Sequence, residues 1–261
     1  KTLVTVGIPY YAKTELNHFR LAIDSVLEQS YKPDEIHLIQ DGPVSEQLRN
    51  LVNQYEKKHN IIKKITIAEN MGLAYALNIS ILNSNSKYYA RMDSDDICHP
   101  ERLKKQIDYM ETHPKIDILG SWVSEFYDDN IFVNSLNYED ANENSFIVKT
   151  PENIEDIRRK FHYRNPLCHV TIIYRRNVFA KVGLYNANYR RTQDLELWSR
   201  VLKKDVGIAN LQQSLVYVRA KDFAEKRSDF ASIIRQLKVR YKYNTLSPKY
   251  NLLKIASIIF R

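Results

Sequence analysis

The stretch that decides the fold is Arg91-Met92-Asp93-Ser94-Asp95-Asp96, which directly follows the run Ser86-Lys87-Tyr88-Tyr89-Ala90. The preceding run is typical of a short buried strand. Three carboxylates within four residues repel one another unless a cation or hydrogen-bond donors offset their charge. At the carboxyl end of a strand in an open α/β sheet, such a cluster points into the crevice where ligands bind. A hard divalent ion completed by substrate phosphates is the usual occupant, and a solvated acidic turn before a helix near Pro100 is the alternative.

The first part of the chain, up to Thr112, alternates between strand and helix patterns. The predicted strands are Leu3–Pro9, Glu35–Gln40, Ile61–Ala68 and Tyr88–Met92. The predicted helices are Glu15–Gln29, Ser45–Lys58, Leu73–Leu82 and Glu101–Thr112. Strand–helix pairs in succession predict an α/β domain with a parallel sheet covered by helices.

The pattern loosens after residue 115. Further strands are predicted at Ile116–Phe126, His169–Tyr174 and Leu215–Val218, and helices at Ile154–Phe161, Arg175–Lys181, Leu195–Leu202, Phe230–Tyr243 and Tyr250–Phe260. Residues 128–150 are polar and indicate an insertion or mobile loop. We therefore predict one domain over residues 1–218 and a helical tail over residues 219–261.

The positive charge is concentrated in that tail. The chain has 261 residues and a net charge of +8, and residues 219–261 hold 11 Lys and Arg against 3 Asp and Glu. The tail therefore accounts for the whole excess, which indicates an anionic partner at that end.

The cysteine content and the lack of long apolar runs restrict the cellular compartment and the cofactors. The two cysteines, Cys98 and Cys168, have no CxxC spacing, which favours a reducing compartment and disfavours disulfides and zinc. No signal-peptide pattern and no apolar run of about 20 residues is evident. We expect a cytoplasmic protein.

Polar residues follow each of the predicted strands of the first part. They are Pro9-Tyr10-Tyr11, Asp41-Gly42, Glu69-Asn70-Met71-Gly72 and the acidic cluster at Asp93. The carboxyl ends of parallel strands meet at one edge of the sheet, so these loops predict a nucleotide site there.

The same loops belong to an ordered set of motifs. The set comprises Val6–Tyr11, Asp24–Tyr31, Asp41–Pro43, Asn70–Asn78, Arg91–Ile97, Pro100–Leu103, Asn165–Thr171 and Gln193–Trp198. With it the chain resembles the family 2 glycosyltransferases, which have the Rossmann-like GT-A fold, over roughly residues 2–220. The resemblance is to the branch that builds bacterial surface polysaccharides. It implies a donor-nucleotide half over about residues 1–115 and an acceptor half over about residues 116–218.

The resemblance also implies roles for single residues. Asp41 contacts the nucleotide base, Pro9 and Tyr10 line its pocket, and the loop with Asn70 and Gly72 belongs to the nucleotide-sugar site. Asp93 lies near the ribose and the metal, and Asp95 binds Mn²⁺ or Mg²⁺. Asp194 is the general base, although Gln193 stands where the family usually has Glu, and Pro43-Val44-Ser45 replaces the common Ser-Thr-Asp.

Other residues have two interpretations. His169 is either a contact for the acceptor or the diphosphate or a structural histidine. Arg190 and Arg191 either bind a phosphate group or form a solvated basic loop.

Together these features predict an inverting, metal-dependent transfer of a sugar to a hydroxyl of a glycan or lipid-linked saccharide, and the resemblance implies that the donor is a UDP-sugar. The setting is synthesis of a capsule, exopolysaccharide or O-antigen. A sugar-1-phosphate nucleotidyltransferase and a catalytically silent nucleotide-sugar-binding protein are the alternatives. The first needs a Gly-rich basic loop after its first strand, where this chain has Pro9-Tyr10-Tyr11.

The tail has its own prediction. Its last segment mixes basic groups with a large apolar surface but is too short to span a bilayer. Such a helix can lie in the interface of an anionic membrane, here the inner face of the cell membrane. The alternative is that it packs on the domain or on a second subunit. Nucleic-acid binding is disfavoured because no recognition motif is present.

Overall fold

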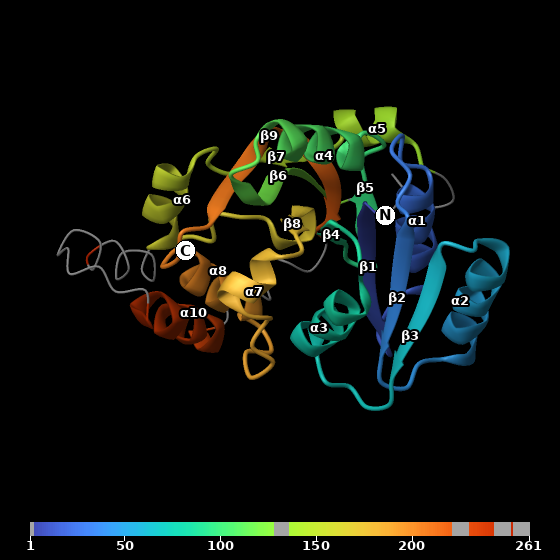
Figure 1. Cartoon of the computed structure of the whole chain (residues 1–261). Helices are drawn as coiled ribbons and strands as arrows, with labels where there is room; N and C mark the ends of the chain where they lie inside the picture. Colours follow the sequence, from blue (N-terminus) through green and yellow to red (C-terminus); the bar gives the residue numbers. More distant parts are fainter. Residues whose placement is uncertain (1–2, 128–135, 221–229, 243–251, 253–261) are drawn as a thin grey trace.

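The computed structural model describes residues 3–127, 136–220, 230–242 and 252. In these residues the chain forms one mixed sheet in the order β3-β2-β1-β4-β8-β6-β9-β5, with β7 beside β6 (Figure 1). The strands are β1 (Val4–Tyr11), β2 (Glu35–Asp41), β3 (Ile62–Ile67), β4 (Tyr88–Arg91), β5 (Ile97–Cys98), β6 (Ile116–Phe126), β7 (Phe146–Val148), β8 (Ile173–Arg175) and β9 (Gly207–Arg219).

Helices cover the sheet on both faces. They are α1 (Leu16–Leu27), α2 (Glu46–Lys58), α3 (Leu73–Asn83), α4 (Arg102–Thr112), α5 (Tyr138–Glu143), α6 (Ile154–Phe161), the 3-10 helix η1 (His169–Thr171), α7 (Val178–Val182), α8 (Gln193–Val201) and α10 (Phe230–Lys242). Apolar residues of α1, α2 and α4 share one core with the sheet, and those of α3, α6, α7, α8 and α10 share the other. The prediction of a helix-covered α/β sheet is confirmed.

The first half is the parallel sheet that the pattern predicted. Strands β3, β2, β1 and β4 run parallel. In β1 the buried side chains of Val4, Val6, Ile8 and Tyr10 belong to one core, because alternate residues of a strand face the same side. The register pairs Tyr11 with Asp41 and Asp41 with Ile67, so the loops after β1, β2 and β3 begin at the same edge.

The second half differs from the prediction between residues 169 and 181. His169–Thr171 is a 3-10 turn rather than the start of a strand, and β8 is short and antiparallel to β4 and β6. In this segment, hydrogen bonds from side chains take the place of backbone pairing between strands. Gln106 donates to the carbonyl oxygen of Thr171 at 2.8 Å, and the hydroxyl of Thr171 accepts the N–H of Ser121 at 3.0 Å. The following helix starts at Val178, because Arg175 still belongs to β8.

Strand β9 is far longer than the predicted Leu215–Val218. It runs parallel to β6 with register irregularities, and its end pairs with β5, a strand that the sequence did not predict. Within residues 128–150, expected to be an insertion or loop, the described part contains α5 and β7. A strand of two residues such as β5 carries no periodicity to detect.

The tail begins as part of the packed structure. Helix α10 confirms the predicted helix from Phe230, and its Val239 is buried in the core that contains α8. The predicted helix Tyr250–Phe260 lies outside the described residues apart from Leu252. Among the described helices, none combines the length and apolar content needed to cross a membrane. The boundary at residue 218 stays a prediction.

A buried arginine joins β4 to η1. Arg102, at the start of α4, is fully buried and donates to the carbonyl oxygens of Arg91 at 2.8 Å and Val170 at 3.0 Å. Its Nε also donates to Gln106 at 3.2 Å. The guanidinium therefore satisfies backbone groups of β4 and of the segment before β8.

Removing Arg102 should destabilise the protein strongly. Arg102→Ala leaves two buried carbonyl oxygens unpaired and a cavity, so we expect a loss of at least about 3 kcal/mol in the free energy of unfolding. Lys104→Ala is the control on the same helix, because its exposed ion pair with Asp108 contributes less than about 1 kcal/mol. Urea unfolding of both variants tests this, and equal losses would contradict it.

Candidate active site

The loop after β2 is tied to the start of α3 by the carboxylate of Asp41. Asp41 is buried, and its Oδ1 and Oδ2 accept the backbone N–H groups of Met71 at 2.7 Å and Gly72 at 2.9 Å. The amide of Asn70 donates to the carbonyl oxygen of Asp41 at 3.2 Å. A negative charge at the N-terminus of a helix is favourable, so Asp41 shapes the loop as well as facing the site edge.

Two glycines make this close approach possible. Gly42 and Gly72 have φ angles of +83° and +90°, which favour glycine. A Cβ on Gly42 would lie 2.7 Å from the backbone nitrogen of Asn70. The loops after β2 and β3 are thus built against each other.

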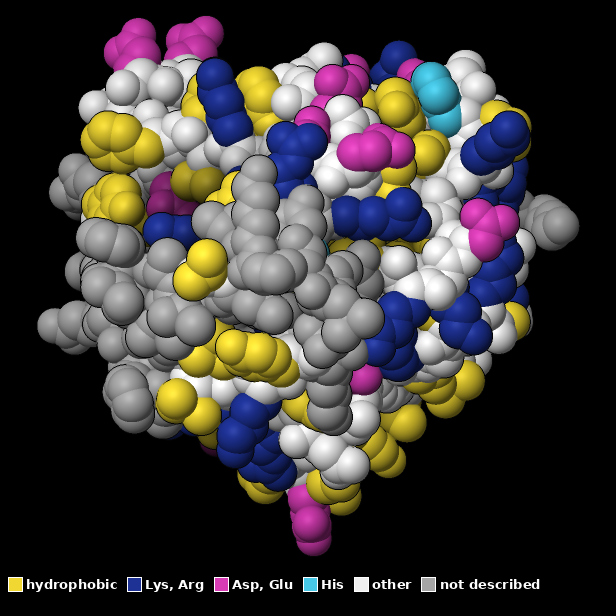
Figure 2. Space-filling model, turned by 90° about the vertical axis from the view of Figure 1, so that its left-hand side faces the viewer, with side chains coloured by type: hydrophobic (Ala, Val, Ile, Leu, Met, Phe, Trp, Pro, Cys, Tyr) yellow, Lys and Arg dark blue, Asp and Glu magenta, His cyan; other side chains and the backbone are white. Residues whose placement is uncertain are grey.

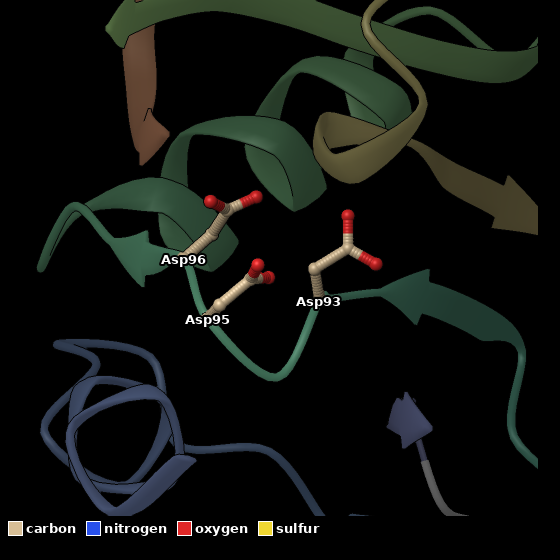
Figure 3. Close-up of side chains that lie close together, drawn as sticks. All are labelled: Asp93, Asp95 and Asp96. Atoms are coloured by element: carbon tan, nitrogen blue, oxygen red, sulfur yellow. The ribbon is translucent and has the colours of Figure 1, made fainter. Parts of the chain in front are cut away.

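The acidic cluster lies on the loop that joins β4 to β5. Figure 3 shows the carboxylates of Asp93, Asp95 and Asp96 rising from this loop toward a shared space. One ligand oxygen from each lies within 4.8 Å of the others. Asp95 is exposed, Asp93 is half-buried and Asp96 is buried. The structure brings Asp96 into the cluster beside the two residues assigned from the sequence.

The charges of the cluster are only partly balanced. Arg91 is buried and its guanidinium forms an ion pair with Asp93. Crowding by protein atoms and then repulsion from Asp93 raise the pKa of Asp95 to about 6. Burial, followed by repulsion from Asp95 and Asp93, raises the pKa of Asp96 well above its usual range. Oxygen donors this close, with uncompensated repulsion, fit a hard divalent cation.

The two tyrosines at the end of β1 point to opposite sides. Tyr10 is 1% exposed, and its ring stacks on Phe19 with the centroids 4.7 Å apart. Tyr11 is 44% exposed, and Pro9 lies two residues before it on the same side of the strand. The ring of Tyr10, which the resemblance assigned to the base pocket, faces the core, and Tyr11 is the tyrosine that this loop exposes. The alternation of β1 was the signal that could have found it.

Asp194 lies in the first turn of α8, on the acceptor side. Its Oδ2 accepts the side-chain amide of Asn165 at 2.7 Å. Burial raises the pKa of Asp194, and the backbone N–H of Leu195, the Asn165 amide and the charge of Arg91 restrain the rise. Asn165 is a second residue that sequence reasoning left without a role, although it is part of a quoted motif. The neighbouring Gln193 is buried, and its Oε1 has no hydrogen-bond partner among the described residues.

His169 belongs to an aromatic cluster. Its Nε2 lies 2.7 Å from the hydroxyl of Tyr185, which lies 2.5 Å from that of Tyr174, and its ring meets Trp198 edge-on. Burial and then the charge of Arg91 hold the pKa of His169 well below its usual range. His169 is therefore neutral at physiological pH and is positioned by its neighbours.

The two arginines of the basic loop differ. Both are exposed, but the guanidinium of Arg190 lies 3.4 Å from the carbonyl oxygen of Asn70. Arg190 thus brings the acceptor half to the loop that opens α3. The structure gives Arg191 no corresponding contact with a described residue of the site.

These positions define a class of protein. A parallel half-sheet with an acidic cluster at its edge, and a separate carboxylate at the start of a facing helix, form the site of an α/β enzyme that handles a nucleotide. Residues 5–183 match the model for glycosyl transferase family 2. The chain belongs to this family: it is a glycosyltransferase with the GT-A fold.

Named relatives share most of the chain. The amylovoran biosynthesis glycosyltransferase AmsE of Erwinia amylovora is 31% identical over 226 residues, which cover 86% of this chain and 79% of that protein. The UDP-Gal:alpha-D-GlcNAc-diphosphoundecaprenol beta-1,3-galactosyltransferase of Escherichia coli is 29% identical, with 92% of this chain and 83% of that protein covered.

Solved structures show the same fold. S. aureus TarS 1–349 in complex with UDP matches with a TM-score of 0.64 and 17% identity, covering 98% of this chain and 70% of that chain. The chain spans 43% of the longer TarS structure. The mannosyltransferase PcManGT of Pyrobaculum calidifontis, in complex with GDP-Man and Mn²⁺, matches with a TM-score of 0.66 and 12% identity, covering 99% and 69%.

The role of Asp41 in the loop structure can be tested by Asp41→Asn. The amide retains only one acceptor oxygen, so one of the two N–H groups loses its partner, and we expect a loss of about 1–3 kcal/mol in unfolding free energy. Asp34→Asn is the matched control, because Oδ2 of Asp34 alone accepts both of its backbone N–H groups, from Leu3 and Val4. Denaturant unfolding that shows equal losses would contradict this reading.

Proposed function

We propose that the protein is an inverting, metal-dependent glycosyltransferase that moves a sugar from a UDP-sugar to a hydroxyl group of a glycan or lipid-linked saccharide. The observation that carries the proposal is the pair of separate carboxylate sites around Arg91. Burial is the first cause that raises the pKa of both Asp95 and Asp194, and the charge of Arg91 counteracts both rises, so both carboxylates lie within its electrostatic reach. One site suits a cation and the other suits a base.

The donor is proposed to bind at the edge formed by the first half. Asp41 is assigned to the nucleotide base. Pro9 and Tyr11 are assigned to the pocket around the base, with Tyr11 in place of the buried Tyr10. Asn70 and Gly72 are assigned to the nucleotide. UDP as the nucleotide is supported by the TarS complex with UDP and by the E. coli relative, whose name includes UDP-Gal. Arg190, which reaches this loop, is assigned to the diphosphate.

Asp95 and Asp93 would hold Mn²⁺ or Mg²⁺. When bound, the ion neutralises the charge that develops on the leaving diphosphate. Asp93 is also paired with Arg91, so Asp95 is the carboxylate with more freedom to reorient toward a cation. The Mn²⁺ in the PcManGT complex supports this assignment.

Asp194 is proposed as the general base. An acceptor hydroxyl is a poor nucleophile at neutral pH, so its proton must be taken by a carboxylate within hydrogen-bond reach. Asn165 holds one oxygen of Asp194 and thereby orients the other. Attack from the side opposite the leaving group inverts the anomeric configuration. His169, held by Tyr185, is assigned to the wall of the acceptor site.

The biological setting is proposed to be synthesis of a bacterial surface polysaccharide. AmsE is named for amylovoran biosynthesis and the E. coli enzyme for a diphosphoundecaprenol acceptor. Membership of the family disfavours the nucleotidyltransferase alternative. The presence of both Asp95 and Asp194 argues against a catalytically silent binder.

We also propose that residues 219–261 contact an anionic membrane at its cytoplasmic face. Helix α10 packs Val239 inward and exposes Lys238 and Tyr241. Figure 2 shows this side of the molecule, where Lys and Arg side chains are interspersed with hydrophobic and acidic ones. Each such cation near an anionic surface contributes about 1 kcal/mol.

The membrane proposal predicts that the protein floats with anionic liposomes at low salt. A chain ending after Lys242 retains the packed α10 but loses residues 243–261, and it should float less. Neutral liposomes are the control. Failure of the full chain to bind anionic vesicles would contradict the proposal.

Asp95→Asn should abolish Mn²⁺-dependent binding of UDP while leaving the fold intact, because Asp95 is exposed and its removal relieves repulsion. Calorimetric titration of UDP with and without Mn²⁺ measures the effect. Asp108→Asn, on the exposed surface of α4, is the matched control. Undiminished Mn²⁺-dependent binding by Asp95→Asn would show that the cation is held elsewhere.

Asp194→Asn should lower kcat by about 10²–10⁴-fold with donor affinity largely kept. Because burial raises the pKa of Asp194 and the base acts when deprotonated, kcat should fall as pH drops through a value above the usual range for Asp. Saturating Mn²⁺ competes with the proton on Asp95 but not with that on Asp194. At saturating Mn²⁺ the unaltered protein should therefore still lose kcat at low pH. Asp194→Asn should abolish this loss.

A further inference from the structure

The loop that carries the acidic cluster is fastened at its far end. After Asp96 the chain enters β5, whose Ile97 and Cys98 pair with Tyr217 and Val216 near the end of β9. The loop is therefore held between β4 on one side and β9 on the other. The next residues of β9 reach the cluster itself.

Arg219 contacts two members of the cluster at once. Its backbone N–H donates to Oδ1 of Asp96 at 3.0 Å, and its Nε donates to the carbonyl oxygen of Asp95 at 3.3 Å. The first bond orients the buried carboxylate, and the second fixes the peptide that carries the exposed one. Both donors lie where they offset the repulsion within the cluster.

Arg219 is itself held in place by the sheet. Its guanidinium lies 4.8 Å above the ring of Phe126, which is fully buried. Phe126 pairs with Arg219 in the β6–β9 register, and its carbonyl oxygen accepts the N–H of Ala220 at 2.9 Å. The rigidity of the two longest strands is thereby transmitted to the loop.

We propose that Arg219 is a positioning residue that sets the spacing of the carboxylates for the divalent cation. The inference rests on the proposed function, since it assumes that the cluster binds a cation. Groups that orient metal ligands typically contribute 10- to 100-fold, roughly, to metal affinity. Arg219 is also the first residue of the predicted tail, residues 219–261, so the charged tail starts at the residue that contacts the cluster.

The test is the Mn²⁺ dependence of Arg219→Ala, measured by calorimetric titration of UDP at a series of Mn²⁺ concentrations and by kinetics. We expect the half-saturating Mn²⁺ concentration to rise about 10- to 100-fold, with kcat recovering at saturating Mn²⁺. Arg219→Lys should behave like Arg219→Ala, because one ammonium cannot lie flat on Phe126 and also donate to Asp95. Full recovery by Lys would overturn the proposal, since charge alone would then suffice.

Arg175 provides a matched control at the other end of the sheet. Its guanidinium also lies over a ring, that of Tyr88 at 5.3 Å, and its Nε donates to a carbonyl oxygen, that of Ile116 at 2.8 Å. Arg175→Ala should lower the melting temperature without changing the Mn²⁺ dependence. An equal rise of the Mn²⁺ requirement in both variants would overturn the proposal.

A substitution of Phe126 and a comparison with the unaltered protein complete the test. Where Arg219→Ala does not fold, Phe126→Leu withdraws the ring while Arg219 remains, and it should raise the Mn²⁺ requirement in the same direction. If the unaltered protein shows no dependence on Mn²⁺ or Mg²⁺, the proposed function and this inference both fail. If the unaltered protein depends on Mn²⁺ and Asp95→Asn removes the dependence, but the Arg219 variants leave it unchanged, this inference alone fails.

Discussion

The burial of one guanidinium, that of Arg91, is the interaction on which the site depends. Burial disfavours its charge, and the carboxylates of the site, Asp93 first, restore it, so that the pKa of Arg91 is raised. The backbone of Arg91 is fixed, because its N–H donates to the carbonyl oxygen of Ile172 and its carbonyl oxygen accepts a hydrogen bond from the guanidinium of Arg102. A buried charge requires partners. The carboxylates must therefore stay close to it in the folded state.

The same charge joins the two halves of the enzyme. Arg91 ends β4, the last of the parallel strands of the first half, and β4 pairs with β8 of the second half. Its field reaches Asp95 on the loop after β4 and Asp194 and His169 in the second half of the chain. Burial and then this charge lower the pKa of His169, and the same charge counteracts the rise in the pKa of Asp194. A nucleotide-sugar between the halves would meet a site whose charges are already coupled.

Much of the candidate site could be predicted because its residues stand in loops directly after strands. Asp41, Asp93 and Asp95 follow apolar runs that are easy to recognise, and Asp194 starts a helix. Tyr10 was assigned to the base pocket by resemblance, whereas the alternation of β1 turns its ring into the core and leaves Tyr11 exposed. Asn165 and Arg219 carry no local signal of their roles, since each acts through a partner that is distant in the chain.

The sequence by itself determined the layered α/β architecture, the parallel first half and the edge at which the polar loops gather. These properties follow from strand and helix periodicity and from turn residues, which are local. Only the tertiary structure decided the antiparallel β8, the long curve of β9 and its pairing with β5, and hence the contact of Arg219 with the cluster. Each of these depends on packing between segments that lie up to 124 residues apart. Such packing is selected by the fit of the whole core, and no short stretch of sequence encodes it.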